Sequence, residues 1–294
     1  MGIDRRAFIA AAGAAAAGGA ATQLGAQSAA EKNGSSEGKT RFAVNIEMWW
    51  RGLPFLDRIR AAHRAGFPAV EFWPWRGKPI DETRALTEEL GIEVAQFTAW
   101  GFVPGLNDPA QHDNFVGQIE EGCQTAKKLR CKKMTVVGGN DIAGKSPAEM
   151  HQAIIDGLKR AAPIAEKHQI MLILEPMNIR RDHKGHCLYG SPDAVRICRE
   201  VNSPMVKINW DLYHMQISEG DLCGRLRDGF DQVGYLQLAD HPGRHEPGTG
   251  EVHYNRVLRQ AYELGYRGYV GLECSPRDGE EKAVERVRAA DRWI

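Results

Sequence analysis

Short apolar runs alternate with amphipathic segments along most of the chain. Eight of these runs are rich in β-branched and aromatic residues and are almost continuously apolar. That pattern is typical of parallel strands buried on both faces. The predicted strands are residues 42–47, 69–73, 92–99, 132–138, 170–175, 206–211, 234–240 and 268–274.

The segments between these runs have the apolar spacing of helices that pack on a sheet. Clear examples are residues 55–66, 80–91 and 153–169. The first two end in Gly66 and Gly91, just before a predicted strand. Glycine is typical of a helix end because it readily adopts the left-handed conformation that closes a helix.

This alternation predicts an α/β protein, a (β/α)8 TIM barrel that forms a single domain from residue 41 to residue 294. Eight such units fit the roughly 250 residues usual for a closed barrel. An open, doubly wound sheet is the competing fold. It would need fewer strands or a dinucleotide-binding loop, and no GxGxxG motif follows the first predicted strand.

The first forty residues differ in composition from the rest. In residues 1–30, Arg5 and Arg6 precede a weakly apolar run dominated by Ala and Gly, with small residues for cleavage near residues 26–30. This resembles a twin-arginine export signal and predicts a periplasmic or other extracytoplasmic location. An Ala/Gly-rich tail is the alternative interpretation. Residues 31–40 form a polar linker.

Charge and length exclude some classes of protein. Lys plus Arg equals Asp plus Glu at 38 each, which argues against a nucleic-acid binder, since such proteins carry a basic excess. No apolar stretch reaches the roughly 20 residues of a membrane span. The six Cys show no CxxC pair, and a twin-arginine substrate folds in a reducing cytosol, so we expect mostly free, buried thiols.

Oxygen-bearing side chains follow four consecutive predicted strands. Glu175 and Asp211 end two strands, Gln237 lies near the end of the next, and Glu273 lies near the end of the last. The carboxyl ends of barrel strands meet at one face, where active sites lie. Buried carboxylates there need a compensating charge, and an all-oxygen set suits Mg²⁺ or Mn²⁺. Taken singly, each acid could instead be a salt-bridge or helix-cap residue.

Several stretches carry a family resemblance. QLADHPGRHEPGTGEVHY (237–254) is the most specific, supported by LEPMN (174–178), DLYHMQISEGDL (211–222) and GYVGLEC (268–274). In these stretches the chain resembles the hydroxypyruvate isomerase family of the xylose isomerase-like TIM barrel superfamily. The loops at 73–80 and 98–109 depart from the family pattern, which leaves the identity of the substrate open.

The resemblance implies a metal-dependent isomerase that interconverts hydroxypyruvate and tartronate semialdehyde, or a close hydroxy-oxo acid, through an enediolate. It also implies that Glu175 and Glu273 are the catalytic acid and base, and that both bind the metal together with Asp211 and Gln237. A bound metal would stabilise the enediolate charge while a carboxylate moves the proton. Which of the two acts as the base is left open by the sequence.

Two further residues are candidates for substrate binding. Arg244 lies in the loop after the seventh predicted strand, and its guanidinium matches a carboxylate. The alternative is an ion pair with Glu246 or Glu251 that shapes the loop. His214, three residues after Asp211, could bond a substrate oxygen or orient a metal ligand.

Aromatic residues follow the first three predicted strands and could either line a pocket or pack in the core. They are Trp49, Trp50, Trp73, Trp75 and Trp100. If they line the site, a substrate larger than a three-carbon acid becomes reasonable.

Other functions remain open. The same residues could serve a ketose epimerase or aldose–ketose isomerase on free sugars, or a sugar or inosose dehydratase. A nucleic-acid phosphodiesterase would need a His-rich, multi-zinc cluster, and a sugar-binding module would not need two bases. The expected partner is a small molecule, a hydroxy-oxo acid or a sugar, and the sequence leaves a homo-oligomer open.

Overall fold

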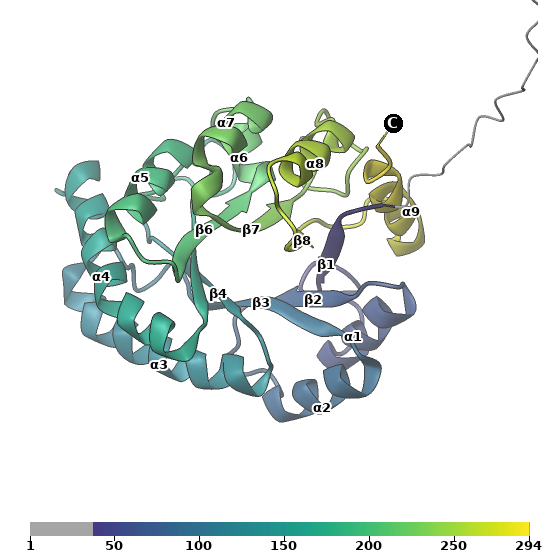
Figure 1. The fold of residues 1–294 in the computed structure, drawn as a ribbon, viewed down its shortest axis with the longest axis horizontal. Coiled ribbons are helices and arrows are strands. Elements are labelled where there is room, and N and C mark those ends of the chain that lie inside the picture. The colour runs from purple at the N-terminus through teal and green to yellow at the C-terminus, as the bar shows by residue number, and fades with distance from the viewer. Residues whose placement is uncertain (1–37, 294) are drawn as a thin grey trace, which may run out of the picture. The chain divides into compact units, whose positions relative to one another are not determined.

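The eight predicted strands form one closed parallel barrel. The computed structural model describes residues 38–293, and the strands pair in chain order, with the last returning to the first (Figure 1). The strands are β1 (Arg41–Asn45), β2 (Ala69–Phe72), β3 (Glu93–Trp100), β4 (Lys133–Val137), β5 (Met171–Glu175), β6 (Val206–Asp211), β7 (Val233–Leu238) and β8 (Tyr269–Leu272). The predicted fold class is therefore confirmed.

Helices follow the strands and form an outer ring around the sheet, as Figure 1 shows. The helices are α1 (Phe55–Arg64), α2 (Ile80–Leu90), α3 (His112–Lys128), α4 (Pro147–His168), α5 (Ser191–Val201), α6 (Leu212–Ser218), α7 (Leu222–Gly229), α8 (Tyr254–Glu263) and α9 (Glu280–Ala290), with short 3-10 turns at Pro109–Gln111 and Phe230–Gln232. The sequence placed the start of α4 six residues too late, because a Ser146–Glu149 capping box begins the helix upstream of its apolar stretch.

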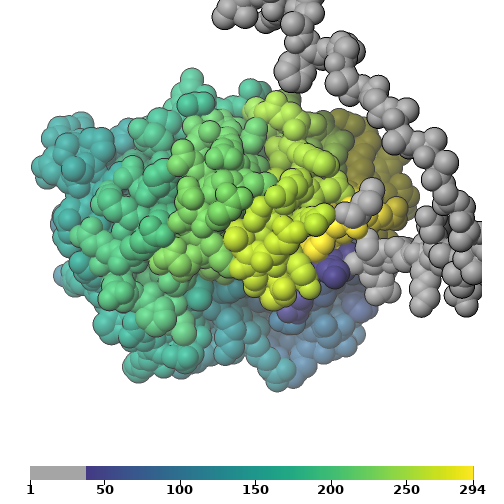
Figure 2. Space-filling model, turned by 45° about the horizontal axis from the view of Figure 1, so that its top comes forward, coloured from purple at the N-terminus to yellow at the C-terminus, as the bar shows by residue number. Residues whose placement is uncertain are grey.

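The barrel closes where the two ends of the domain meet. Arg41 to Val44 of β1 pair in register with Tyr269 to Leu272 of β8. Figure 2 shows the purple start of the barrel domain lying against its yellow C-terminal part. The predicted export signal and most of the linker lie outside the described residues, so both stay predictions.

Inward-facing residues alternate along each strand and stack in layers. A small apolar cluster, separate from the main core, fills the lower layer with Ala43, Ala69, Ala95, Ile173, Tyr235 and Tyr269. Side chains two residues further along a strand face the same interior. That step leads from Ile173 to Glu175 and from Tyr235 to Gln237. Polar groups therefore lie above the apolar layer, toward the carboxyl ends of the strands.

The expectation for the cysteines is confirmed. All six thiols are free, and five are buried. Burial raises the pKa of Cys187 to about 12, so this thiol stays protonated and unreactive at neutral pH. No helix in residues 38–293 combines the length and apolar character needed to cross a bilayer.

Candidate active site

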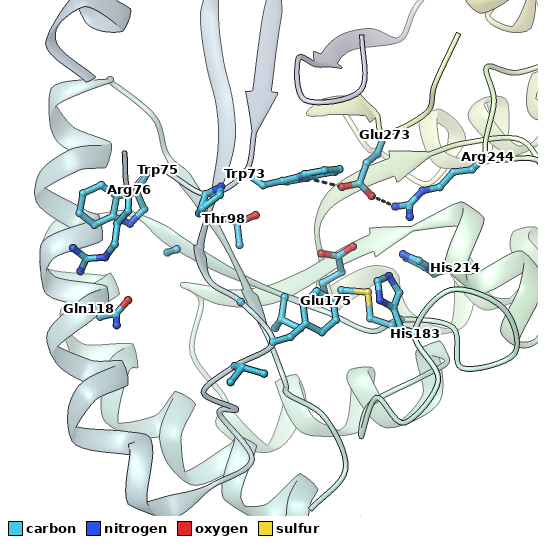
Figure 3. Close-up of a pocket in the computed structure, with 17 residues that line it drawn as sticks. Trp73, Trp75, Arg76, Thr98, Gln118, Glu175, His183, His214, Arg244 and Glu273 are labelled. Carbon is cyan, nitrogen blue, oxygen red and sulfur yellow. Dashed lines mark hydrogen bonds and ion pairs between the residues drawn. The ribbon is translucent and has the colours of Figure 1, made fainter. Parts of the chain in front are cut away.

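Three buried carboxylates converge at the carboxyl end of the barrel. Glu175, Asp211 and Glu273 place oxygen atoms within 4.8 Å of one another and of a His214 nitrogen. Each of these four side chains is at most 5% exposed. They line or adjoin a pocket of about 460 Å³ at the mouth of the barrel (Figure 3).

The electrostatics of this cluster are unfavourable without a cation. Burial, followed by the charges of Glu273 and Asp211, raises the pKa of Glu175 well above its usual range. Burial and Glu273 raise the pKa of Asp211 to about 8. Low dielectric and neighbouring like charges both disfavour the ionised form. Arg244 is the positive charge that offsets part of this effect.

Asp211 has one oxygen with a partner and one without. Its Oδ1 accepts a hydrogen bond from the Tyr213 backbone N at 2.8 Å and so caps α6. Its buried Oδ2 has no hydrogen-bond partner. A buried carboxylate oxygen left this way is costly. The orphaned oxygen, beside two more buried carboxylates, fits a divalent metal site.

His214 lies within the cluster but presents a hydrogen to it. The Asn178 amide oxygen accepts from the Arg181 and Asp182 backbone N atoms at 3.0 and 3.1 Å. The Asn178 Nδ2 therefore donates to His214 Nδ1 at 2.6 Å. Burial lowers the pKa of His214 well below its usual value, so the ring is neutral. Its single ring N–H hydrogen is therefore on Nε2, and this nitrogen lies 3.5 Å from Asp211 Oδ2.

Gln237 lies beside Asp211 on the neighbouring strand, and Glu71 fixes its amide. The Gln237 Nε2 donates to Glu71 Oε1 at 2.7 Å, so the amide oxygen faces the other way. That oxygen accepts from Asn209 Nδ2 at 2.6 Å. A carbonyl oxygen has two lone pairs, so this geometry leaves Gln237 one acceptor site.

Glu71 itself was missed by the sequence analysis. It is fully buried on β2 and accepts from Asn45, Gln237 and Tyr235. Burial, then Glu273, raises the pKa of Glu71 to about 7. The carboxylate fits because β8 has Gly271 opposite, where a Cβ would lie 2.3 Å from Glu71 Oε2. A lone acid inside an apolar strand, two residues after Ala69, was the available signal.

We expect Glu71→Ala to destabilise the protein by about 2–4 kcal/mol, because it leaves buried donors on three other residues unpaired. Urea unfolding would measure this change. The control is Glu93→Ala on β3, whose carboxylate is 64% exposed and pairs with Arg41, and whose loss should cost less than about 1 kcal/mol. Equal effects of the two substitutions would contradict a structural role for Glu71.

Glu273 is held by two donors on opposite oxygens. Trp73 Nε1 donates to its Oε1 at 2.8 Å, and the Arg244 guanidinium donates to its Oε2 at 2.7 Å. Figure 3 shows both contacts as dashed lines. Within the described residues, no comparable side-chain hydrogen bond holds Glu175, which lines the pocket. The two carboxylates are therefore chemically different.

Arg244 points into the pocket and not toward the loop acids. It is paired with Glu273 and packs over the Tyr213 ring at 5.1 Å. Its buried Nε has no partner. Glu246 pairs with Arg286, and Glu251 accepts from Gln216. The structure therefore contradicts the alternative interpretation, an ion pair between Arg244 and Glu246 or Glu251.

The five tryptophans divide between the two predicted roles. Trp73 and Trp75 line the pocket. Trp49 and Trp100 are buried in the core, and Trp50 packs against Trp49 and Phe67. The pocket also contains two residues that the sequence analysis did not single out. These are Phe102 and His183, whose rings stack at 4.9 Å.

Comparison with known proteins identifies a matching family and several similar enzymes. The family described as "Xylose isomerase-like TIM barrel" matches residues 59–293. The hydroxypyruvate isomerase of Escherichia coli K12 is 31% identical over 250 residues, covering 83% of this chain and 96% of that protein. The 2-oxo-tetronate isomerase of Cupriavidus necator is 34% identical over 246 residues, covering 81% and 94%.

Among solved structures, one titled AP endonuclease, family 2, from Brucella melitensis superposes with a TM-score of 0.79. It is 28% identical and covers 83% of this chain and 96% of that one.

Proposed function

The chain belongs to the xylose isomerase-like TIM barrel family and is an isomerase of the hydroxypyruvate isomerase type, and we propose that it is a metal-dependent enzyme that moves a proton between adjacent carbons of a hydroxy-oxo compound. Hydroxypyruvate and tartronate semialdehyde are a three-carbon pair of this kind that carries a carboxylate. The observation that carries the proposal is the cluster of three buried carboxylates, of which Glu175 and Glu273 line the pocket and Asp211 has an oxygen with no hydrogen-bond partner among the described residues.

The proposed metal ligands are Glu175, Asp211, Gln237 and Glu273. Three carboxylates and an amide oxygen favour Mg²⁺ or Mn²⁺. His214 is not among them, because its Nε2 carries a hydrogen in the pattern of contacts around Asn178. When bound, the metal would act as a Lewis acid toward the oxygens of the substrate.

We assign the proton transfer to Glu175. Its carboxylate faces the pocket without a side-chain hydrogen bond, and its surroundings raise its pKa. Such a group both accepts and returns a proton near neutral pH. Glu273 keeps its place through Trp73 and Arg244. We propose that it flanks the substrate on the opposite side as the second acid or base and moves the hydroxyl proton from one substrate oxygen to the other, while Glu175 moves the carbon-bound proton.

Arg244 and His214 supply the remaining polar contacts to the substrate. The Arg244 guanidinium lines the pocket and offers donors to a substrate carboxylate or hydroxyl. The Nε2 hydrogen of His214 would bond the oxygen on which negative charge develops in the enediolate. Both side chains line the pocket together with Glu175.

A nuclease function fits this site less well. The structure titled AP endonuclease shares the fold. In this chain, the cluster has three carboxylates and one His, whereas phosphodiester chemistry in a multi-zinc site uses more imidazole ligands. The net charge of zero also gives no attraction to a phosphate backbone.

Solvent exchange tests the proposed chemistry directly. In D₂O with Mn²⁺, the protein should introduce deuterium next to the carbonyl of hydroxypyruvate, 2-oxo-tetronate or a ketohexose, and NMR would detect it. Protein treated with EDTA should show less than about 1% of that rate, since the enediolate charge lacks its stabilising cation. Absence of exchange with every compound in the panel would refute the proposal.

A further inference from the structure

The pocket is larger than the chemistry at its acidic end requires. Its volume is about 460 Å³, within the range of pockets that enclose drug-sized ligands. A three-carbon acid has only seven non-hydrogen atoms. In Figure 3, Glu175, Glu273, Arg244 and His214 gather on one side of the pocket, whereas Trp75, Arg76 and Gln118 lie across from them.

We propose that this opposite half is a subsite for a non-reacting sugar ring, so that the substrate is a glycosylated ketose or sugar acid and not a free three-carbon acid. The subsite consists of Trp75, Arg76 and Gln118. The inference rests on the proposed function for the reaction itself and adds the class of substrate.

Aromatic rings with a few polar groups suit a sugar ring. The Trp75 indole is half-buried and packs against the core, so it presents a fixed apolar surface to the C–H face of a pyranose. The Phe102 ring lines the pocket nearer to the acidic cluster, where it stacks on His183. Arg76 and Gln118 line the Trp75 half with polar groups that can bond ring hydroxyls.

The subsite is joined to the acidic cluster through its walls. On one side, Trp73 lines the pocket and donates to Glu273. On the other, Phe102 stacks on His183, whose ring lies 5.2 Å from that of His214. A ligand can therefore fill both halves of one continuous pocket. Binding energy from the distant ring would then orient the reacting carbons.

Arg76 is held in place beside the proposed ring. Its guanidinium lies 4.5 Å from the centre of the Trp75 ring and pairs with Glu121 of α3. These contacts link the loop after β2 to α3, where Gln118 also lies. Residues 73–80, the loop that carries Trp75 and Arg76, are also among those that depart from the family pattern.

Comparison of three ketoses and acids of increasing size tests the subsite. The compounds are hydroxypyruvate, D-fructose and isomaltulose, which is fructose carrying a glucose ring on C6. With Mn²⁺-loaded protein, kcat/KM for deuterium exchange should be highest for isomaltulose. In Trp75→Ala and in Gln118→Ala, the ratio of kcat/KM for isomaltulose to that for hydroxypyruvate should fall about tenfold.

A matched control and a binding measurement separate the outcomes. Tyr189→Ala removes a half-exposed aromatic side chain that does not line the pocket, and it should leave the ratio unchanged. Exchange that is fastest with hydroxypyruvate, or a ratio unaffected by both pocket variants, would overturn the subsite while leaving the proposed chemistry intact.

Calorimetric titration with isomaltulose provides a readout that does not depend on turnover. Binding that weakens about tenfold in Trp75→Ala, without exchange on any compound, would support the subsite and refute the proposed function. The assignment to a sugar would be overturned if a fructose derivative that carries a phenyl group in place of the glucose ring bound as tightly as isomaltulose.

Discussion

Glu175→Gln should abolish proton exchange at the substrate carbon, with a loss of at least about 10³-fold. The amide has the size and shape of the carboxylate but cannot accept and return a proton. Glu175 lines the pocket without a side-chain hydrogen bond among the described residues, so its loss disturbs little around it. Deuterium incorporation measured by NMR at saturating Mn²⁺ would test the assignment.

Controls distinguish loss of the base from loss of the fold or of the metal. The melting temperature of the variant should stay within a few degrees of wild type, and calorimetry should show that Mn²⁺ still binds. The comparison substitution is Glu200→Gln on the exposed face of α5, which should leave exchange unchanged. Wild-type rates of deuterium incorporation in Glu175→Gln would remove Glu175 from the mechanism.

Glu273→Gln is expected to act differently. Its amide would present NH₂ to one of two donors, Trp73 Nε1 or the Arg244 guanidinium, so one of these contacts must break. The variant should lose exchange and also weaken substrate binding, because Arg244 loses its anchor. Glu175→Gln should lower kcat with little change in KM.

Without metal, the protein should lose stability as the pH rises from about 6.5 to 8, by a few kcal/mol. The folded-state pKa values of Asp211 (about 8) and Glu71 (about 7) are raised by burial and by Glu273. A carboxyl with a raised pKa holds its proton more tightly in the folded state. Its contribution to folding stability is therefore complete below its unfolded pKa near 4, and it is lost gradually as the pH rises to its folded pKa. Urea unfolding in EDTA would measure this.

Other carboxyls contribute with the opposite sign but in a different pH range. Arg199 holds the pKa of Asp231 at about 2, and Arg160 lowers the pKa of Asp113. The stability that these groups add increases as the pH rises to about 5, and it is constant above that pH.

Burial lowers the pKa values of His186, to about 4, and of His214, so the contribution of these rings increases until about pH 6.5 and is constant above it. A decline in stability between pH 6.5 and 8 is therefore specific to the buried acids.

Mn²⁺ should reverse the decline, because a cation in the cluster offsets the carboxylate charges. At a hundredfold excess over its Kd, it should add about 2.7 kcal/mol. Asp211→Asn removes one of the ionising groups, so its stability should depend less on pH and respond less to Mn²⁺. Equal stability at pH 6.5 and 8 in EDTA, together with no response to Mn²⁺, would rule out a metal site here.

Most of the barrel could be predicted from the sequence because it depends on local regularities. Parallel strands buried on both faces produce continuous apolar runs, and each observed strand lies within a few residues of its prediction. The position of Glu175 and Asp211 as the last residues of their strands was sufficient to bring them together, because all barrel strands end at the same face.

The hydrogen-bond partners of Glu71 and His214 could not be predicted from the sequence. Glu71 lies inside an apolar strand, and its meaning depends on donors from β1 and β7 that are distant in sequence. His214 has its hydrogen on Nε2 because Asn178, 36 residues earlier, fills Nδ1. The periodicity of a strand says which way a side chain faces, but not which groups from other strands meet it.

The sequence by itself determined the barrel and the acids at its mouth, because periodicity and strand ends are local properties of the chain, and the family was indicated by the resemblance of stretches such as residues 237–254. Only the tertiary structure decided that Arg244 pairs with Glu273, that Trp73 and Trp75 line the pocket while Trp49 and Trp100 fill the core, and that the pocket extends beyond the acids. These facts depend on distances between loops of different β–α units, which are set when the barrel closes.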